Sequence, residues 1–275
     1  MARLNHKDIS LEVDDTSSQL LSLQYKGKEL FHPGCSQSYQ GKGWKNSEIA
    51  CFPIFGPVDN QQLILGSKQF SLEQHGISRY LPFSLYKKTP TSLTYIQEYD
   101  GANIPNPKAD GASHPPFLSW FPYCLTKTFS LDDNVLRCQF HLENTSSHSF
   151  PYNFAWHPAF LKQEDISFHT PEQMYSLAEV VTASNRFTGA NLRLEGLQSL
   201  RVTSQDCGFD LRTKGFSHLV LWSPSLDANM FCVEQLASLP DPEQKMVSIS
   251  PLTLVGGDVA SFEVSLHPFL MNSLQ

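Results

Sequence analysis

Two histidines and one glutamate are the residues of this chain best suited to acid–base chemistry. His157 lies between Trp156 and Pro158, and the residue before a proline is restricted to extended conformations, so its side chain has a set direction. His75 precedes a glycine, and Glu234 ends a strongly apolar stretch. In apolar surroundings, an imidazole and a carboxylate acquire pKa values suited to proton transfer near neutral pH.

Each of the three residues also has an ordinary structural explanation. His157 can be a core histidine bonded to a backbone carbonyl, His75 a turn residue, and Glu234 a strand-end residue that faces solvent. Together they fit a different pattern, because two restrained histidines, a half-buried carboxylate and aromatic neighbours are what a sugar site needs. We therefore expect a sugar site with an acid–base pair.

Other kinds of chemistry have weaker support. Histidine and glutamate also form metal sites, but these three residues are far apart and no His-x-His or His-x-x-x-His pair occurs, so we predict no metal and no cofactor. No Gly-x-Ser-x-Gly motif marks a nucleophilic serine, and the glycine pair Gly41 and Gly43 precedes no helical pattern. The six cysteines contain no Cys-x-x-Cys pair and are expected to be buried free thiols in a reducing compartment.

Composition limits the class of partner. The formal net charge is −7 and no dense run of Lys and Arg occurs, which argues against a nucleic-acid or anionic-membrane surface. The N-terminal residues lack the apolar region of a signal peptide, and no apolar run reaches the roughly eighteen residues of a membrane span. We expect a cytoplasmic monomer or weak dimer that binds a small-molecule sugar, either an aldohexose or its phosphate.

The elements that must position these residues are short strands. Apolar and polar residues alternate at period two from Ile9 to Leu30, and again in Tyr123–Phe129 and Val135–Leu142, which are joined through the turn Asp132-Asp133-Asn134. About fifteen or more such segments, separated by turn signals, predict an all-β fold, a large antiparallel β-sandwich. We expect a single domain over residues 1–275.

Three further segments have a specific interpretation. Ala50–Val58 is apolar but contains two prolines and a glycine, so we expect a buried irregular wall outside the centre of a sheet. Asp100–Pro116 is rich in turn residues and is expected to be a long loop at the rim of a site. Glu172–Val181 comes closest to a helical period.

Four motifs, in this order, resemble the aldose 1-epimerase (galactose mutarotase) superfamily, in particular its bacterial galactose-mutarotase-like and hexose-6-phosphate epimerase-like branches. They are Trp44 followed by Phe52–Gly56, His75–Arg79 leading to Pro82-Phe83, Asn144-Thr145 leading to Trp156–Phe160, and Cys232–Glu234.

This resemblance implies a β-sandwich called a supersandwich and an isomerase that interconverts the α and β anomers of an aldohexose through the open chain. By resemblance, Glu234 is the general base that removes the anomeric hydroxyl proton, and His157 is the general acid that protonates the ring oxygen. The resemblance further implies substrate-binding roles for His75, Arg79, Trp156, Trp44 and Phe52.

The chain departs from its relatives at two positions. Relatives often carry arginines shortly after the positions of Trp44 and Gly56, where this chain has Asn46 and Pro57. Three interpretations stay open: a mutarotase for a neutral aldohexose, a hexose-6-phosphate 1-epimerase, and a non-catalytic sugar-binding member of the fold. We favour the neutral sugar, because phosphate is usually bound by arginine and Arg79 is the one arginine near the motifs that we expect to face inward.

Overall fold

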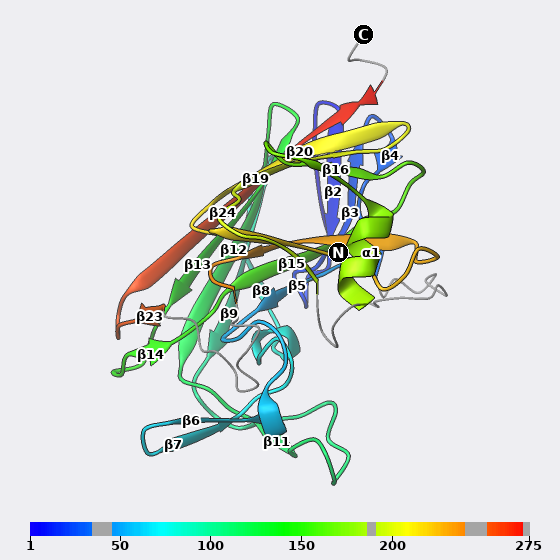
Figure 1. Cartoon of the computed structure of the whole chain (residues 1–275). Helices are drawn as coiled ribbons and strands as arrows, with labels where there is room; N and C mark the ends of the chain where they lie inside the picture. The colour runs from blue at the N-terminus through cyan, green and yellow to red at the C-terminus, as the bar shows by residue number, and fades with distance from the viewer. Residues whose placement is uncertain (35–45, 186–190, 240–251, 272–275) are drawn as a thin grey trace.

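The computed structural model of the chain describes residues 1–34, 46–185, 191–239 and 252–271. Its largest layer is a nine-stranded antiparallel sheet, which runs from the lower left to the top of Figure 1. Strands from the middle and from the end of the chain pair in this sheet, so its hydrogen bonds are mostly long-range. In order across the sheet, its strands are β17 (Met174–Ser176), β16 (Ser167–His169), β19 (Ser199–Thr203), β20 (Cys207–Lys214), β24 (Val259–Leu270), β13 (Val135–Glu143), β12 (Tyr123–Asp132), β9 (Ser92–Tyr99) and β8 (Ser84–Lys88).

A five-stranded antiparallel sheet forms the second layer. Aromatic rings join the two layers: Phe154 lies 4.8 Å from Phe262, and Phe160 lies 4.4 Å from Phe209, measured between ring centroids. Stacked rings at this spacing bury large apolar surfaces, so the core lies between the sheets. The predicted antiparallel β-sandwich is confirmed. The strands of the second layer, in order, are β18 (Leu192–Leu194), β21 (His218–Trp222), β22 (Met230–Leu236), β15 (Ala155–Leu161) and β5 (Glu48–Cys51).

Smaller elements complete the fold. The hairpin of β6 (Gln62–Leu65) and β7 (Lys68–Ser71) extends at the bottom of Figure 1, and the α-helix α1 (Leu177–Asn185) lies at the right of the view. No helix in the described part of the chain is long and apolar enough to cross a membrane. The remaining strands and short 3₁₀ helices are β1 (Ala2–His6), β2 (Ile9–Val13), β3 (Leu20–Tyr25), β4 (Lys28–Glu29), β6 (Gln62–Leu65), β7 (Lys68–Ser71), β10 (Ile104–Pro105), β11 (Phe117–Leu118), β14 (Phe150–Pro151), β23 (Thr253–Leu254), η1 (Asp59–Gln61) and η2 (Ser78–Tyr80).

Several local predictions are confirmed. β12 and β13 form the expected hairpin, and both central turn residues, Asp133 and Asn134, have positive φ angles of 42° and 64°, as this kind of tight turn requires. In the segment Glu172–Val181, whose pattern came closest to a helical period, the residues from Leu177 belong to α1, whereas Met174–Ser176 form the strand β17. In the segment Ala50–Val58, the first two residues end the edge strand β5, and residues 52–58 form no strand and are largely buried.

A buried ion pair crosses the space between the layers. The ammonium group of Lys127 on β12 lies 2.6 Å from a carboxylate oxygen of Glu48 on β5, and these side chains are 3% and 0% exposed. Glu48 also accepts hydrogen bonds from the backbone N–H of Leu20, at 2.7 Å, and from the indole N–H of Trp156. Because buried charges require partners, this network fixes β5, β12 and β15 relative to one another.

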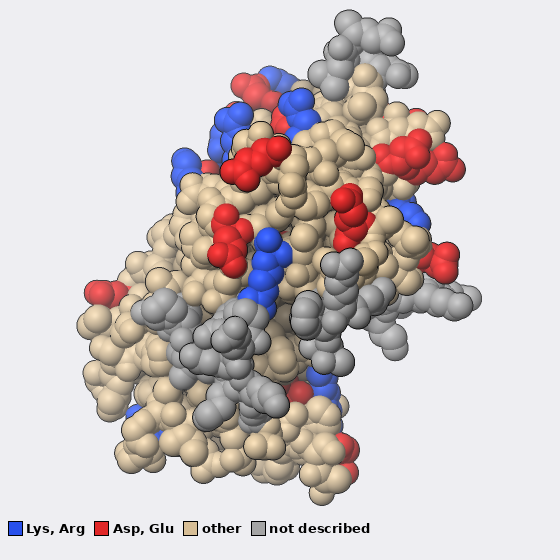
Figure 2. Space-filling model, viewed as in Figure 1, with Lys and Arg blue, Asp and Glu red and all other residues tan. Residues whose placement is uncertain are grey.

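Charged side chains on the face shown in Figure 2 are mixed in sign. Lysine, arginine, aspartate and glutamate are interspersed over the upper half of this view, and no dense basic area forms there. The described charges on this face therefore offer no concentrated positive surface for a nucleic acid.

Candidate active site

His157 and Glu234 face each other on adjacent antiparallel strands. The flanking pairs Trp156–Gln235 and Ala159–Cys232 set the register of β15 against β22 and place His157 opposite Glu234. The Nε2 atom of His157 is 3.4 Å from the Oε2 atom of Glu234. The two residues are 6% and 2% exposed, so bulk water is largely excluded from the pair.

The pair lies on the face of the five-stranded sheet that points away from the interlayer core. Cys232 shares this face, because it is two residues from Glu234 on the same strand. Trp222 of β21 pairs with Cys232, and its ring centroid is 6.4 Å from that of His157. Trp222 is only partly buried and offers an aromatic surface beside the pair, which the sequence interpretation had not assigned to it.

His75 approaches the pair from a strained turn. Its φ angle is +67°, an uncommon conformation for a residue other than glycine. Gly76 follows with φ +80°, and a Cβ atom there would lie 2.1 Å from the carbonyl oxygen of Phe52, so this position requires glycine. The His75 ring is 5.4 Å from the His157 ring and 5.2 Å from the Phe55 ring, between centroids.

A hydrogen bond determines which nitrogen of His75 carries the proton. The backbone N–H of Gly56 donates to Nδ1 of His75 at 3.2 Å, so the neutral ring carries its hydrogen on Nε2. Burial lowers the pKa of His75 well below 6.5, and the His157 ring and the Arg79 guanidinium act in the same direction. His75 is thus neutral, and its Nε2 atom lies 3.3 Å from the side-chain amide nitrogen of Gln74.

Burial shifts the pKa values of the pair in opposite directions. It raises the pKa of the Glu234 carboxyl well above 4.5. It lowers the pKa of the His157 imidazole from 6.5 to about 3, with a smaller contribution from the Arg79 guanidinium. Low-dielectric surroundings favour the uncharged form of each group, which is the protonated carboxyl of Glu234 and the neutral imidazole of His157.

Two arginines are candidates to act near the pair, Arg79 through its charge on His157 and Arg193 through its strand register. Arg79 lies in η2, where its guanidinium is 5.3 Å from the centroid of the Tyr80 ring and donates to the carbonyl of Gln74 at 3.5 Å. Arg193 of β18 pairs with Val220, which pairs with Glu234, so Arg193 shares the site face of the sheet. The sequence analysis did not select Arg193. The alternation of apolar and polar residues in Leu192–Leu194 was the available signal, because it indicates a strand with Arg193 on one face.

Two predicted substrate-binding residues, Trp156 and Phe52, are not brought to the pair. Trp156 is fully buried on the opposite face of β15, because adjacent strand residues point to opposite sides, and it bonds to Glu48 in the core. Phe52 is also fully buried, with its ring 4.6 Å from that of Tyr123, and the neighbouring Phe55 faces the site in its place. Trp44 lies outside the described residues.

The long loop over residues 100–116 is attached beside His75. Glu73 is 2% exposed and accepts hydrogen bonds from Asn106 at 2.8 Å and His114 at 2.7 Å, and the ammonium group of Lys108 is 3.6 Å away. Burial alone would raise the pKa of Glu73, but these partners outweigh it and hold the pKa below 4.5. The predicted rim loop is therefore tied to the turn that carries His75.

Three possible metal ligands meet at the pair. Donor atoms of His157, Cys232 and Glu234 all lie within 4.8 Å of one another, and all three residues are buried. The sequence pointed to no metal site, because it offered no clustered histidines. The available signal was Cys232 and Glu234 at positions i and i+2 of a strand, which puts both on one face.

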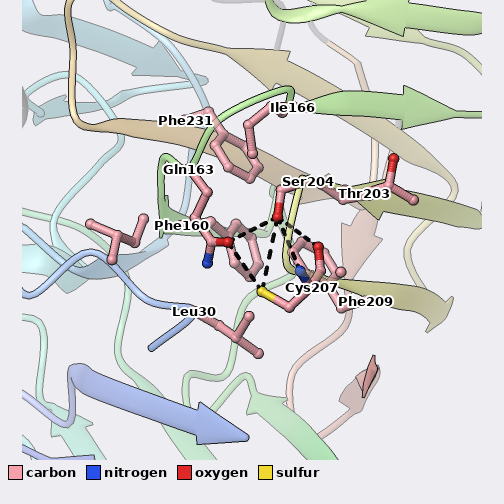
Figure 3. A pocket seen from close by; sticks show the side chains of 12 residues that line it. Leu30, Phe160, Gln163, Ile166, Thr203, Ser204, Cys207, Phe209 and Phe231 are labelled. Carbon is pink, nitrogen blue, oxygen red and sulfur yellow. Dashed lines mark hydrogen bonds between the residues drawn. The ribbon is translucent and has the colours of Figure 1, made fainter. Parts of the chain in front are cut away.

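A small cavity lies elsewhere, where β15 meets β19 and β20. Figure 3 shows Gln163, Ser204 and Cys207 pointing toward one another there, with Ser204 Oγ 2.9 Å from the Gln163 side-chain oxygen. Its volume of about 20 Å³ holds one water molecule and no sugar. The His157–Glu234 pair is therefore the better candidate for a sugar site.

Comparisons with known proteins point to one fold. No model of a known protein family matches the chain, and no curated protein matches it. A galactose mutarotase-like protein from Lactobacillus casei matches with 19% identity and a TM-score of 0.73, over 98% of this chain and 100% of that one. A galactose mutarotase related enzyme from Lactobacillus acidophilus matches with 15% identity and a TM-score of 0.73, over 98% and 97%.

A third solved structure, a galactose 1-epimerase from Lactobacillus acidophilus, matches with 14% identity and a TM-score of 0.64, over 97% of this chain and 92% of that one. At identities of 14 to 19%, these likenesses show the fold. The chain has the galactose mutarotase-like β-sandwich fold, as the sequence resemblance predicted.

Proposed function

We propose that this chain, which has the galactose mutarotase-like fold, is an aldose 1-epimerase that interconverts the α and β anomers of an aldohexose. The observation that carries the proposal is the buried pair of His157 and Glu234, with 3.4 Å between Nε2 and Oε2. Ring opening removes a proton from the anomeric hydroxyl and delivers one to the ring oxygen, and both oxygens are bonded to the same carbon. A pair that holds one proton and accepts one serves both needs.

In this proposal Glu234 is the general base and His157 the general acid. Transfer of the shared proton from Glu234 to His157 gives a carboxylate and an imidazolium, which stabilise each other across 3.4 Å. Glu234 then takes the hydroxyl proton while His157 protonates the ring oxygen. Ring closure on the opposite face of the aldehyde returns both protons, so the pair ends as it began. Each positioned group typically contributes about 10²–10⁴-fold to the rate.

Three neighbouring side chains fit the sugar itself. We assign the Nε2–H of His75, now 3.3 Å from the Gln74 side-chain amide, as a donor to a sugar hydroxyl, and Arg79, whose charge acts on His157, as a cationic donor. Trp222 offers the aromatic surface that the sequence analysis had assigned to Trp156. An apolar platform with a few fixed polar groups is the usual composition of a sugar site.

Polarimetry or exchange NMR on freshly dissolved α-anomers tests the proposal. We expect the protein to accelerate the approach to anomeric equilibrium for at least one aldohexose, and Glu234→Gln to lose this acceleration while keeping sugar affinity. If the parent protein binds the sugar but leaves the spontaneous rate unchanged, the non-catalytic sugar-binding interpretation is correct instead.

The alternative substrate is a hexose 6-phosphate. Arg193, in the same cross-strand row as Glu234, is the observation that favours it, because two arginines suit a phosphate better than one. We still favour the neutral sugar, given the net charge of −7 and the Asn46 and Pro57 positions. Side-by-side kcat/KM values for glucose, galactose and their 6-phosphates decide the matter. A tenfold preference for a phosphate, about 1.4 kcal/mol, reverses our choice.

The organisation of the protein is part of the same proposal. A single domain over residues 1–275 is supported by matches that cover 97 to 98% of the chain. We further propose that the protein acts in the cytoplasm as a monomer or weak dimer, and light scattering across a range of protein concentrations measures the oligomeric state.

A further inference from the structure

We propose that His157, Cys232 and Glu234 also bind a thiophilic divalent metal ion, Zn²⁺ above all, and that the bound ion blocks epimerisation. The inhibition rests on the proposed function, whereas the binding rests on the arrangement of the three side chains alone. The ion would therefore act as an inhibitor of this site and not as its cofactor.

The distances between the three donor atoms suit one small ion. Zinc binds imidazole nitrogen and carboxylate oxygen at about 2.0–2.2 Å and thiolate sulfur at about 2.3 Å, so tetrahedral ligands are about 3.3–3.6 Å apart. The His157 and Glu234 atoms already have a separation of 3.4 Å. The other two separations between donor atoms are within 4.8 Å. Side-chain rotations that move a donor atom by about 1 Å therefore bring all three atoms to zinc-binding distances.

The backbone holds the three ligands without further folding. Cys232 and Glu234 are two residues apart on β22, so both point to one face, and His157 is opposite Glu234 on β15. Two of the three ligands are thus on a strand that pairs on both sides. The hydrogen bonds of the sheet already hold the backbone of these ligand residues in place. Little conformational entropy is therefore lost when the ion binds.

Charge balance favours the ion in this buried position. All three ligand residues are buried, and a single uncompensated negative charge is costly in such surroundings. A thiolate, a carboxylate and a neutral imidazole around Zn²⁺ give a total charge of zero. Binding releases two protons, one from the thiol and one from the His157–Glu234 pair, and no electron transfer is involved.

The same balance explains why the ion would inhibit. The bound ion coordinates the lone pair of His157 and the carboxylate of Glu234. It also displaces the one proton that the pair shares. Neither group is then free to exchange a proton with the sugar. In the metal-bound protein, His157 and Glu234 are present but cannot transfer the protons that ring opening requires.

Cobalt(II) titration of the chelator-treated protein tests the binding. A bound Co²⁺ with a thiolate ligand gives a sulfur-to-cobalt charge-transfer absorption in the near ultraviolet, and Zn²⁺ should remove it by competition. We expect this absorption in the parent protein and in Cys124→Ser, whose thiol lies on β12 of the other sheet. It should vanish in Cys232→Ser, with metal affinity weakened at least about tenfold.

Circular dichroism establishes that each variant is folded, and Glu234→Gln, which keeps the side-chain shape, provides a second ligand removal if Cys232→Ser does not fold. The binding proposal is overturned if Co²⁺ gives no charge-transfer absorption, or if the absorption and the Zn²⁺ affinity are the same in the parent and in both ligand variants.

The inhibition is measured separately. Each protein is compared with its own metal-free epimerisation rate, and we expect Zn²⁺ to slow the parent and EDTA to restore it, with Cys232→Ser needing at least about tenfold more Zn²⁺ for the same effect. An unchanged rate in the Zn²⁺-loaded parent overturns the inhibition. If no sugar is epimerised by any form, the proposed function fails while the cobalt spectrum still decides the metal site.

Discussion

Replacing Lys127 by Met tests the buried ion pair that joins the layers beneath the site. Methionine keeps most of the length of lysine and removes its charge, so the change is mainly electrostatic. Glu48 keeps its hydrogen bonds from Leu20 and Trp156 but loses the ammonium group 2.6 Å away. A carboxylate that is 0% exposed is then left without a counter-charge.

The expected size of the effect follows from that burial. Removing one partner of a buried ion pair typically costs about 3–5 kcal/mol, whereas an exposed pair contributes about 0–1 kcal/mol. With an unfolding entropy of about 2.1 cal/mol/K per residue, 275 residues give about 0.6 kcal/mol/K. The midpoint of thermal unfolding should therefore fall by about 5–9 °C.

Urea and thermal denaturation followed by circular dichroism measure both quantities. Asp210→Asn is the matched control, because its partner Arg201 forms an exposed pair with it at 2.7 Å. In a double-mutant cycle, Glu48→Gln combined with Lys127→Met should cost less than the sum of the two single variants, since neither charge is then left alone. A loss below 1 kcal/mol for Lys127→Met, or full additivity, would show that the pair does not hold the layers together.

Four further predictions follow. Glu234→Gln and His157→Asn should each lower kcat/KM by at least about 100-fold, and the double variant should lose little more, because the two act on one proton; additive losses in steady-state assays would contradict this. Chelation of divalent ions should cause no loss of activity, and a loss with EDTA that one metal restores would refute this. The Glu73 carboxylate, whose pKa is held below 4.5, stabilises the 100–116 loop above pH 4.5 and loses this effect as the pH falls through its native pKa. The protection factors of amide hydrogens in that loop, which correct for the intrinsic pH dependence of exchange, should thus fall below pH 4.5, and Glu73→Gln should remove this fall; an equal fall in the variant would count against the attachment. Gly76→Ala should raise KM and destabilise the turn, because its Cβ would meet the Phe52 carbonyl at 2.1 Å; unchanged kinetics and melting temperature would exclude the close approach.

Local patterns predicted much of the fold. The β12–β13 hairpin follows from period-two alternation and from residues that tolerate positive φ angles in its turn. The edge position of β5 follows from the prolines and the glycine after it. The same kind of reasoning singled out His157, whose following proline restricts it, and Glu234, whose charge is unusual in an apolar strand. Such signals involve residues within a few positions of one another, so the sequence contains them directly.

The choice of face could not be made from local patterns. Alternation along β15 requires Trp156 and His157 to point to opposite sides, but it does not say which side is the core. The sequence interpretation assigned both to the sugar, and the structure buries Trp156 against Glu48. The aromatic surface beside His157 comes from Trp222 of β21, which is 65 residues further along the chain by residue number.

The sequence by itself determined that the chain forms short antiparallel strands, and it singled out His75, His157 and Glu234, because residue type and spacing act locally. Tertiary structure decided which of these groups meet. The register of β15 against β22 brings His157 within 3.4 Å of Glu234, and the layer packing brings Lys127 to Glu48. Both contacts join residues nearly eighty positions apart. Their formation depends on burying whole sheet faces together, which is a property of the packed layers and not of any single segment.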